Sequence, residues 1–225
     1  MSAVPHARAS ALAAIESTGV VAVVRLSAAA QVYDVAHALM AGGVRAIEVT
    51  MTVPGAIVLI EQLCGALPSN VFVGAGTVTD DETAGAVIRA GATFVVSPVL
   101  RPAVIETCRR HDVAVVPGCL TPTEIVTAWE AGADVVKVFP ATSLGPAFFK
   151  DMRGPLPQIR LMPTGGVTRE NAGEWIRAGA VAIGVGTALV DQKAVAAGRF
   201  EAIADNARHF IRAVQQARGL AASGA

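Results

Sequence analysis

The chain has 225 residues, of which 53% are hydrophobic and 16% charged, so one large domain or two small ones can bury a sizeable core. Its 18 basic and 18 acidic side chains cancel, which gives no electrostatic reason to expect a nucleic acid or a membrane as partner. The three cysteines are too scattered for disulfides or zinc, and neither a signal peptide nor a transmembrane run is apparent, so we expect a cytoplasmic protein.

Strand-like and helix-like segments alternate along the whole chain. Four strands follow an Ala-Gly-Ala or Ala-Gly-Gly tripeptide, which places glycine just past the end of the preceding helix. In chain order we expect strands at 20–26, within 41–50, at 71–77, within 90–98, at 113–118, within 131–140, at 159–166 and within 178–186. Helices are expected before, between and after these strands, at 5–18, 28–41, 54–66, 80–90, 101–111, 121–131, 168–178 and 199–218. A proline-rich loop precedes the strand at 159–166.

This alternation predicts a TIM (β/α)8 barrel with an additional N-terminal helix, forming a single domain over 1–225. The strands are continuous apolar runs, as expected for a parallel sheet that helices cover. An open doubly wound sheet is the alternative, but it does not call for eight evenly spaced units. In a barrel, chemistry belongs at the carboxyl ends of the strands.

Glycines dominate the last two strand ends. The seventh strand ends in "PTGG", with Thr164, Gly165 and Gly166, and the eighth ends in "GVGT", with Gly186 and Thr187. Glycine lets backbone N–H groups approach an anion, and a following helix N-terminus adds partial positive charge. Single glycines would indicate only tight turns, but at these two strands together they predict a phosphate site.

Two charged residues interrupt apolar strands. Glu48 lies in "RAIEVT" and Lys137 in "DVVKVF", and alternation along each strand lets both point into the barrel. A structural salt bridge is the alternative, although buried pairs contribute little to stability. A lysine in a poorly solvated site has a lowered pKa, and its neutral amine can attack a carbonyl while a carboxylate shuttles protons.

These residues indicate a class I aldolase or another Schiff-base lyase that acts on a phosphorylated substrate. A metal-dependent aldolase would need a ligand cluster at the strand ends. The four histidines lie elsewhere and show no metal-ligand spacing, so we expect no metal.

Longer stretches carry a family resemblance from about residue 20 to residue 190: "AGGVRAIEVTMTVPGA", "VGAGTVTD", "FVVSP", "VVPGCLTPTE", "VVKVFPA" and "LMPTGGVTRENAGEWIRAGAVAIGVGTALV". The chain resembles the family of 2-keto-3-deoxy-6-phosphogluconate (KDPG) and 4-hydroxy-2-oxoglutarate (KHG) aldolases. The resemblance implies a homotrimer without metal or organic cofactor, with Lys137 as the Schiff-base lysine and Glu48 as the general acid/base. It also implies a substrate pocket formed by Thr77, Phe139, Pro163, Thr164, Gly165, Gly166, Gly186 and Thr187, the glycines and Thr187 holding the phosphate.

One position departs from the family pattern. Many members have an arginine shortly after the glutamate of the second strand, where this chain has Thr52 in "TMTV". Another branch instead ends its first strand with arginine, and "VAVVR" places Arg25 there. We therefore expect Arg25 to contact the substrate carboxylate, whose shape matches a guanidinium. Pairing of Arg25 with Glu48 is the alternative.

The expected reaction is cleavage of KDPG to pyruvate and glyceraldehyde 3-phosphate. Activity on KHG or on the galactonate epimer of KDPG is an alternative substrate choice. A phosphate-binding isomerase, with Lys137 acting only as a charge, and a non-catalytic barrel are further alternatives. A non-catalytic barrel would more naturally have lost Lys137 or Glu48.

Overall fold

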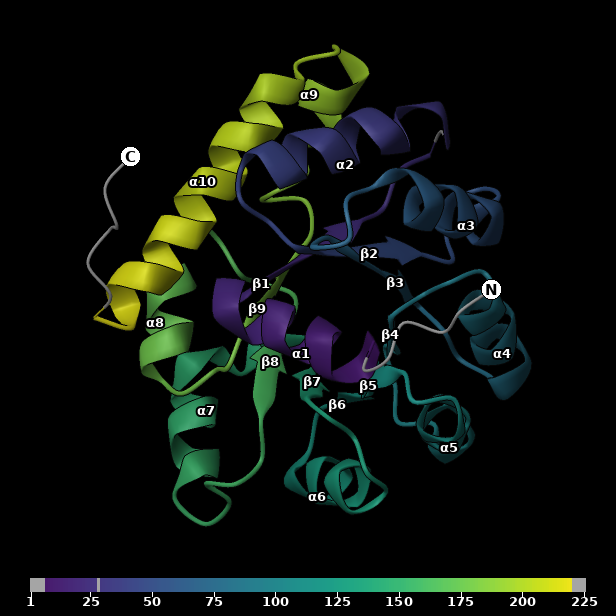
Figure 1. Cartoon of the computed structure of the whole chain (residues 1–225). Coiled ribbons are helices and arrows are strands. Elements are labelled where there is room, and N and C mark those ends of the chain that lie inside the picture. Colours follow the sequence, from purple (N-terminus) through teal and green to yellow (C-terminus); the bar gives the residue numbers. More distant parts are fainter. Residues whose placement is uncertain (1–6, 28, 220–225) are drawn as a thin grey trace.

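In the computed structural model, which describes residues 7–27 and 29–219, parallel strands curl around a central axis and helices surround them (Figure 1). The strands are β1 (Val20–Val24), β2 (Ala46–Thr50), β3 (Phe72–Gly76), β4 (Phe94–Val96), β5 (Ala114–Val116), β6 (Gly118–Cys119), β7 (Val136–Val138), β8 (Leu161–Pro163) and β9 (Ile183–Val185). One sheet has the order β5-β4-β3-β2-β1-β9 and the other β6-β7-β8, with a bridge from Thr164 to Gly184 between β8 and β9.

Pro117 explains why nine strand elements form eight barrel strands in the described part of the chain. It separates β5 from β6, because proline has no N–H to donate to the ladder. Its carbonyl still accepts the Lys137 N–H at 2.9 Å, so the predicted strand at 113–118 continues through the break. The predicted TIM barrel is thereby confirmed.

The helices are α1 (Ala7–Thr18), α2 (Val32–Ala41), α3 (Ala56–Ala66), α4 (Asp81–Arg89), α5 (Pro102–Arg110), α6 (Pro122–Glu130), α7 (Gly145–Arg153), α8 (Ala172–Arg177), α9 (Gln192–Ala196) and α10 (Phe200–Ala217), with short 3-10 turns at Ala29–Gln31 and Ala141–Ser143. Two of them, α7 and α9, are absent from the sequence-based expectations. The Gly145-Pro146 pair reads as a turn, yet proline in the first turn also starts a helix. None of the described helices is long and apolar enough to cross a membrane.

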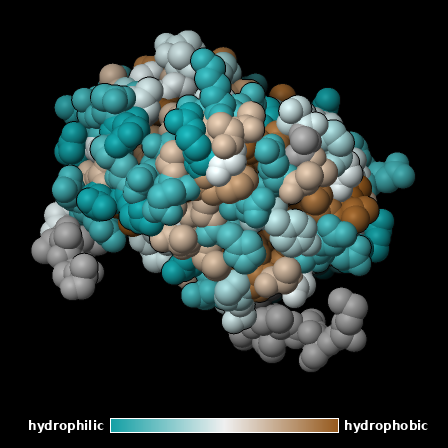
Figure 2. Space-filling view, turned by 90° about the horizontal axis from the view of Figure 1, so that it is seen from above, coloured by the Kyte–Doolittle hydropathy of each residue, from teal (hydrophilic) through white to brown (hydrophobic). Residues whose placement is uncertain are grey.

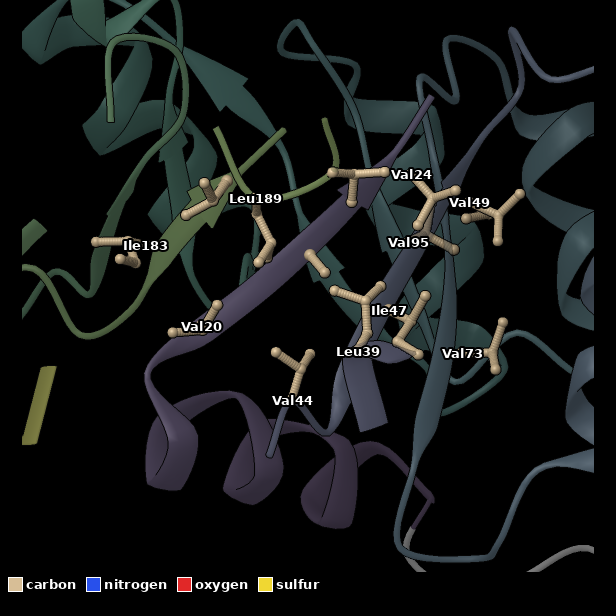
Figure 3. Close-up of a cluster of buried hydrophobic side chains, with 14 of the residues drawn as sticks. Val20, Val24, Leu39, Val44, Ile47, Val49, Val73, Val95, Ile183 and Leu189 are labelled. Carbon is tan, nitrogen blue, oxygen red and sulfur yellow. The ribbon is translucent and has the colours of Figure 1, made fainter. Parts of the chain in front are cut away.

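Strand residues alternate between two cores. Val20 and Val24 point outward into the layer between strands and helices, which Figure 3 shows together with Leu39 and Ile47. Val21 points inward, so Val23 and Arg25 share the inner face of the barrel. This alternation decides which side chains reach the site.

The predicted N-terminal helix is present as α1, and it closes one end of the barrel (Figure 1). Ile15 is fully buried against the inner core, which includes Phe94 and Met162. The opposite end, where the strands finish, is left for the site. The single-domain prediction for 1–225 includes terminal residues outside the described part of the chain and stays a prediction.

Arg8 and Asp134 tie α1 to the barrel. The Arg8 Nη2 atom lies 2.7 Å from Asp134 Oδ1, and Asp134 Oδ2 accepts the Val115 N–H at 3.0 Å. Asp134 is 8% exposed, so removing its carboxylate leaves the buried Val115 N–H unpaired and leaves the Arg8 guanidinium with only the more distant, exposed Asp112. We expect Asp134→Ala to lower the free energy of unfolding by about 2 kcal/mol, measured by urea denaturation.

Asp112 supplies the matched control for this stability prediction. It lies 3.8 Å from Arg8 Nη1 and is 69% exposed, so Asp112→Asn should change the unfolding free energy very little. Equal losses in Asp112→Asn and Asp134→Ala would contradict the assignment of the stabilising role to Asp134.

Candidate active site

Three charged side chains occupy the inner face near the strand ends. Glu48 is in register with Val23 of β1 and Gly74 of β3, and Lys137 is in register with Met162 of β8. Arg25 follows β1 directly. The structure therefore brings together three residues that are far apart in the sequence, as the alternation of the strands predicted.

Lys137 lies in an environment that disfavours its charged form. Its side chain is 5% exposed, and burial lowers the pKa of its ammonium group. The Glu48 carboxylate raises that pKa and the Arg25 guanidinium lowers it, but burial is the largest effect. The Nζ atom also lies 5.0 Å from the centroid of the Phe139 ring, which forms an apolar wall beside the amine.

Glu48 is equally enclosed and carries an unsatisfied carboxylate. Its side chain is 2% exposed, and Oε2 has no hydrogen-bond partner among the described residues. Burial raises the pKa of Glu48, while the positive charges of Lys137 and Arg25 lower it to a smaller extent. No salt bridge joins Glu48 to either cation in the described part of the chain, so neither structural ion pair considered above is formed.

Arg25 faces the opening of the barrel. It is exposed, and its guanidinium makes no hydrogen bond or ion pair with residues that the structure describes, while its carbonyl accepts Gln192 Nε2 at 3.2 Å. The charge of Arg25 nevertheless reaches both Lys137 and Glu48, since it lowers the pKa of each.

A cavity of about 160 Å³ lies over the ends of β7, β8, β9 and β1. Its lining combines backbone-rich loops with one arginine and one aromatic ring: Val23, Arg25, Phe139, Thr164, Gly165, Gly166, Val167, Gly184, Gly186, Thr187, Ala188 and Val190. Lys137 and Glu48 are not lining residues, but Phe139 connects the cavity to the amine because its ring contacts both.

The glycine loops can present several backbone donors to this cavity. Gly165 and Gly166 have φ angles of 86° and 73°, a left-handed conformation that favours glycine. The N–H groups of Gly166, Thr187 and Ala188 make no hydrogen bond within the described residues. Such free N–H groups around a small cavity are suited to binding an oxyanion.

The predicted helix N-termini do not lie at these glycines. The helix expected over 168–178 begins only at Ala172, because Asn171 folds back and its side chain bonds the Gly166 carbonyl and the Thr168 N–H, both at 2.8 Å. After β9, the chain makes one turn, in which the Val190 N–H reaches the Gly186 carbonyl, before α9 begins at Gln192. Any anion binding here therefore depends on loop N–H groups.

Of the three other residues predicted for the substrate pocket, one lines the cavity and two do not. Thr164 lines the cavity, and its buried Oγ1 has no hydrogen-bond partner among the described residues. Pro163 is buried in β8 and does not line the cavity. Thr77 follows β3 with a φ of 61°, which is strained for a β-branched residue and typical of functional sites, yet it does not line the cavity either.

Two residues at the site escaped sequence analysis. Gly76 at the end of β3 contacts Glu48, and Thr142 packs against the loop of Gly165 and Gly166. The sequence "GAGT" contained a signal for Gly76, since a glycine inside a strand marks a close approach of another group. For Thr142 we find no such signal. Among the described residues, no group of three or more metal-ligating side chains is present.

Comparison with known proteins gives a consistent result over most of the chain. The family model for KDPG and KHG aldolase matches residues 12–206. A 2-dehydro-3-deoxy-phosphogluconate aldolase of Treponema pallidum is 38% identical over 194 residues, which cover 84% of this chain and 90% of the relative. A 2-dehydro-3-deoxy-6-phosphogalactonate aldolase of Escherichia coli is 34% identical over 181 residues, covering 80% and 86%.

A solved structure has the same fold. The KDPG aldolase of Legionella pneumophila, with pyruvate captured at low pH as a covalent carbinolamine intermediate, matches with a TM-score of 0.82 at 27% identity. The match covers 88% of this chain and 96% of that one.

Proposed function

We propose that this chain, which belongs to the family of KDPG and KHG aldolases, is a class I aldolase. The proposed reaction is the cleavage of KDPG to pyruvate and glyceraldehyde 3-phosphate. The observation that carries this proposal is the buried Lys137, with its lowered pKa, held near Glu48 on the inner face of the barrel. A carbinolamine forms when an amine adds to a ketone, and Lys137 supplies such an amine here.

The chemistry follows from these two side chains. The neutral amine of Lys137 attacks the C2 ketone of the substrate, and loss of water gives a protonated imine that accepts electrons. Glu48 takes the proton of the C4 hydroxyl group as the C3–C4 bond breaks, which releases glyceraldehyde 3-phosphate. The remaining enamine is protonated at its methyl carbon, and hydrolysis then releases pyruvate and the free lysine.

The cavity next to Phe139 suits the other end of the substrate. Its free N–H groups at the glycine loops would hold the phosphate, and Thr164 and Thr187 offer hydroxyl groups beside them. Holding the distal phosphate fixes the reacting carbon atoms relative to Lys137 and so raises their effective concentration. We assign Thr77 and Pro163 to the neighbourhood of the keto acid on the family resemblance alone.

We test the function by trapping. Borohydride reduces an imine to a stable amine, so pyruvate and borohydride together should add the mass of a 1-carboxyethyl group to the peptide that contains Lys137. The other lysines of the chain, Lys150 and Lys193, are exposed and serve as internal controls in the same digest. An unmodified Lys137 peptide after this treatment would contradict the proposal and favour a barrel in which Lys137 acts only as a charge.

The alternative substrates provide a test of the phosphate assignment. The relative from Escherichia coli acts, by its name, on the galactonate epimer, and KHG belongs to the family description. The glycine loops favour a phosphorylated substrate over KHG, which has no phosphate. Turnover measured on KDPG, its galactonate epimer and KHG would rank the three, and faster turnover of KHG would contradict the phosphate assignment.

Arg25 allows a prediction about pH. Free amine appears as the pH rises through the lowered pKa of Lys137, and the Arg25 charge lowers the pKa of both Lys137 and Glu48. Arg25→Gln should therefore raise both values and move the acid limb of kcat/KM to higher pH. It should also raise KM about tenfold or more, because a charged hydrogen bond to the substrate carboxylate is lost.

Arg25→Lys separates the charge from the shape of the guanidinium. This variant keeps the positive charge, so the acid limb should stay close to that of the wild type while KM still rises. Arg89→Ala, on the exposed face of α4, is the control that should change neither quantity. An unchanged KM in Arg25→Gln would refute the carboxylate contact.

We further propose that the chain is a single-domain, cytoplasmic homotrimer that works without metal. Exposed large apolar side chains at Ile57, Val58, Val99 and Leu120 offer area for subunit contacts. The face seen in Figure 2 mixes hydrophilic residues with hydrophobic ones, which lie mainly over its centre and right side. Light scattering would test the trimer, and full activity in the presence of EDTA would test the absence of a metal.

A further inference from the structure

We propose that Gly76 is a positioning residue for Glu48: the missing side chain at this place in β3 creates the recess that holds the Glu48 carboxyl group. The catalytic part of this inference rests on the proposed aldolase function, in which Glu48 transfers protons. Its structural part, the packing of Glu48 on Gly76, stands independently of any activity.

Two glycines, Gly74 and Gly76, lie on the inner face of β3. Gly74 and Gly76 alternate with Val73 and Ala75, which point to the outer core. A Cβ atom built on Gly74 would overlap the Phe94 ring of β4, and one built on Gly76 would overlap the Glu48 side chain of β2. Each glycine thus makes room for a large group from a neighbouring strand.

The overlap at position 76 involves the Cγ, Cδ and Oε1 atoms of Glu48. The added Cβ would collide with Oε1 and would lie 2.5 Å from Cδ and 2.6 Å from Cγ. Rotation about the last bond of Glu48 moves Oε1 but leaves Cγ in place, so it cannot relieve this crowding. Because Glu48 is 2% exposed, the carboxyl group cannot move away into open solvent either.

Packing, rather than hydrogen bonding, holds the carboxyl group. The carboxyl oxygens of Glu48 have no hydrogen bond to any residue that the structure describes, and Oε2 is buried without a partner. The smooth backbone surface at Gly76 is therefore the contact that sets the position of the proton-transfer group. Glycine is not needed for the backbone itself, since Gly76 is not among the residues with positive φ.

Gly76→Ala should lower kcat about 100-fold or more, which is the effect of displacing a catalytic group by roughly 1 Å. The pH profile should change as well, because a displaced Glu48 interacts differently with Lys137. Gly65→Ala on the exposed face of α3 is the matched control: a Cβ at Gly65 meets nothing within 4 Å, so activity should be unchanged.

Removing the glutamate separates positioning from general damage to the fold. In a Glu48→Ala background the space next to residue 76 is empty, and the new methyl group of Gly76→Ala can fill it. We expect Gly76→Ala to lower the melting temperature and kcat of the wild type, but to change neither in Glu48→Ala. Gly74→Ala, which crowds Phe94, should lower the melting temperature equally in both backgrounds.

Each outcome has one meaning. Wild-type kcat in Gly76→Ala, or an equal loss of melting temperature in both backgrounds, would overturn the positioning role. If Gly76→Ala alone fails to fold, a folded Gly76→Ala/Glu48→Ala double variant supports the inference and an unfolded one overturns it. Failure of borohydride trapping at Lys137 would remove the aldolase function yet leave the melting-temperature comparison valid, so the two failures are distinguishable.

Discussion

Replacing Lys137 with alanine is expected to abolish turnover of KDPG, a loss of about 10⁶-fold or more, comparable to the low end of enzymatic rate enhancements. The reason is that the imine is the only electron sink that the proposed mechanism contains. Without the amine, the C3–C4 bond would have to break to a free carbanion. Steady-state assay of the released pyruvate measures the effect directly.

Other variants separate the role of the amine from the role of its charge. Lys137→Arg keeps a cation in the same strand but cannot supply a neutral nucleophile, so it should be as inactive as Lys137→Ala. Lys150→Ala and Lys193→Ala remove exposed amines and should retain full turnover. Measurable release of pyruvate by Lys137→Arg would show that the charge alone is sufficient and would contradict the Schiff-base mechanism.

Much of this site was predictable because barrel strands alternate with a period of two residues. That rule alone brings Glu48 and Lys137 to the inner face, and the order of the strands brings their ends together. The apolar runs also identify the strands themselves, because a parallel sheet covered by helices is apolar on both faces. Glycine pairs at two strand ends then indicate where backbone donors are free.

The features that escaped prediction depend on contacts between distant residues. Nothing in the local sequence tells that Asn171 bonds back to the Gly166 carbonyl and delays the start of α8. The recess at Gly76 likewise exists only because Glu48 of the neighbouring strand fills it. Register between strands, which turns these glycines into specific contacts, is a tertiary property and is invisible in a single strand.

Glu48→Gln is expected to lower kcat by about 10²- to 10⁴-fold, the usual contribution of a general acid/base. The amide has nearly the same shape, so the packing on Gly76 is kept while proton transfer is lost. The substitution also removes a negative charge that raises the pKa of Lys137. The pKa of the lysine should therefore fall further, and the acid limb of the residual activity should move to lower pH.

This shift of the acid limb is opposite in direction to the one expected for Arg25→Gln, and comparing the two variants tests the role of Lys137 more sharply than either variant alone. Arg25 lowers the pKa of Lys137 and Glu48 raises it. Removing the Arg25 charge should therefore move the acid limb to higher pH, and removing the Glu48 charge should move it to lower pH. Glu61→Gln, on the exposed face of α3, is the control for a lost carboxylate far from the site. If the acid limb shifts in the same direction in Arg25→Gln and Glu48→Gln, it does not follow the ionisation of Lys137. Lys137 would then not be the group whose ionisation limits the reaction at low pH.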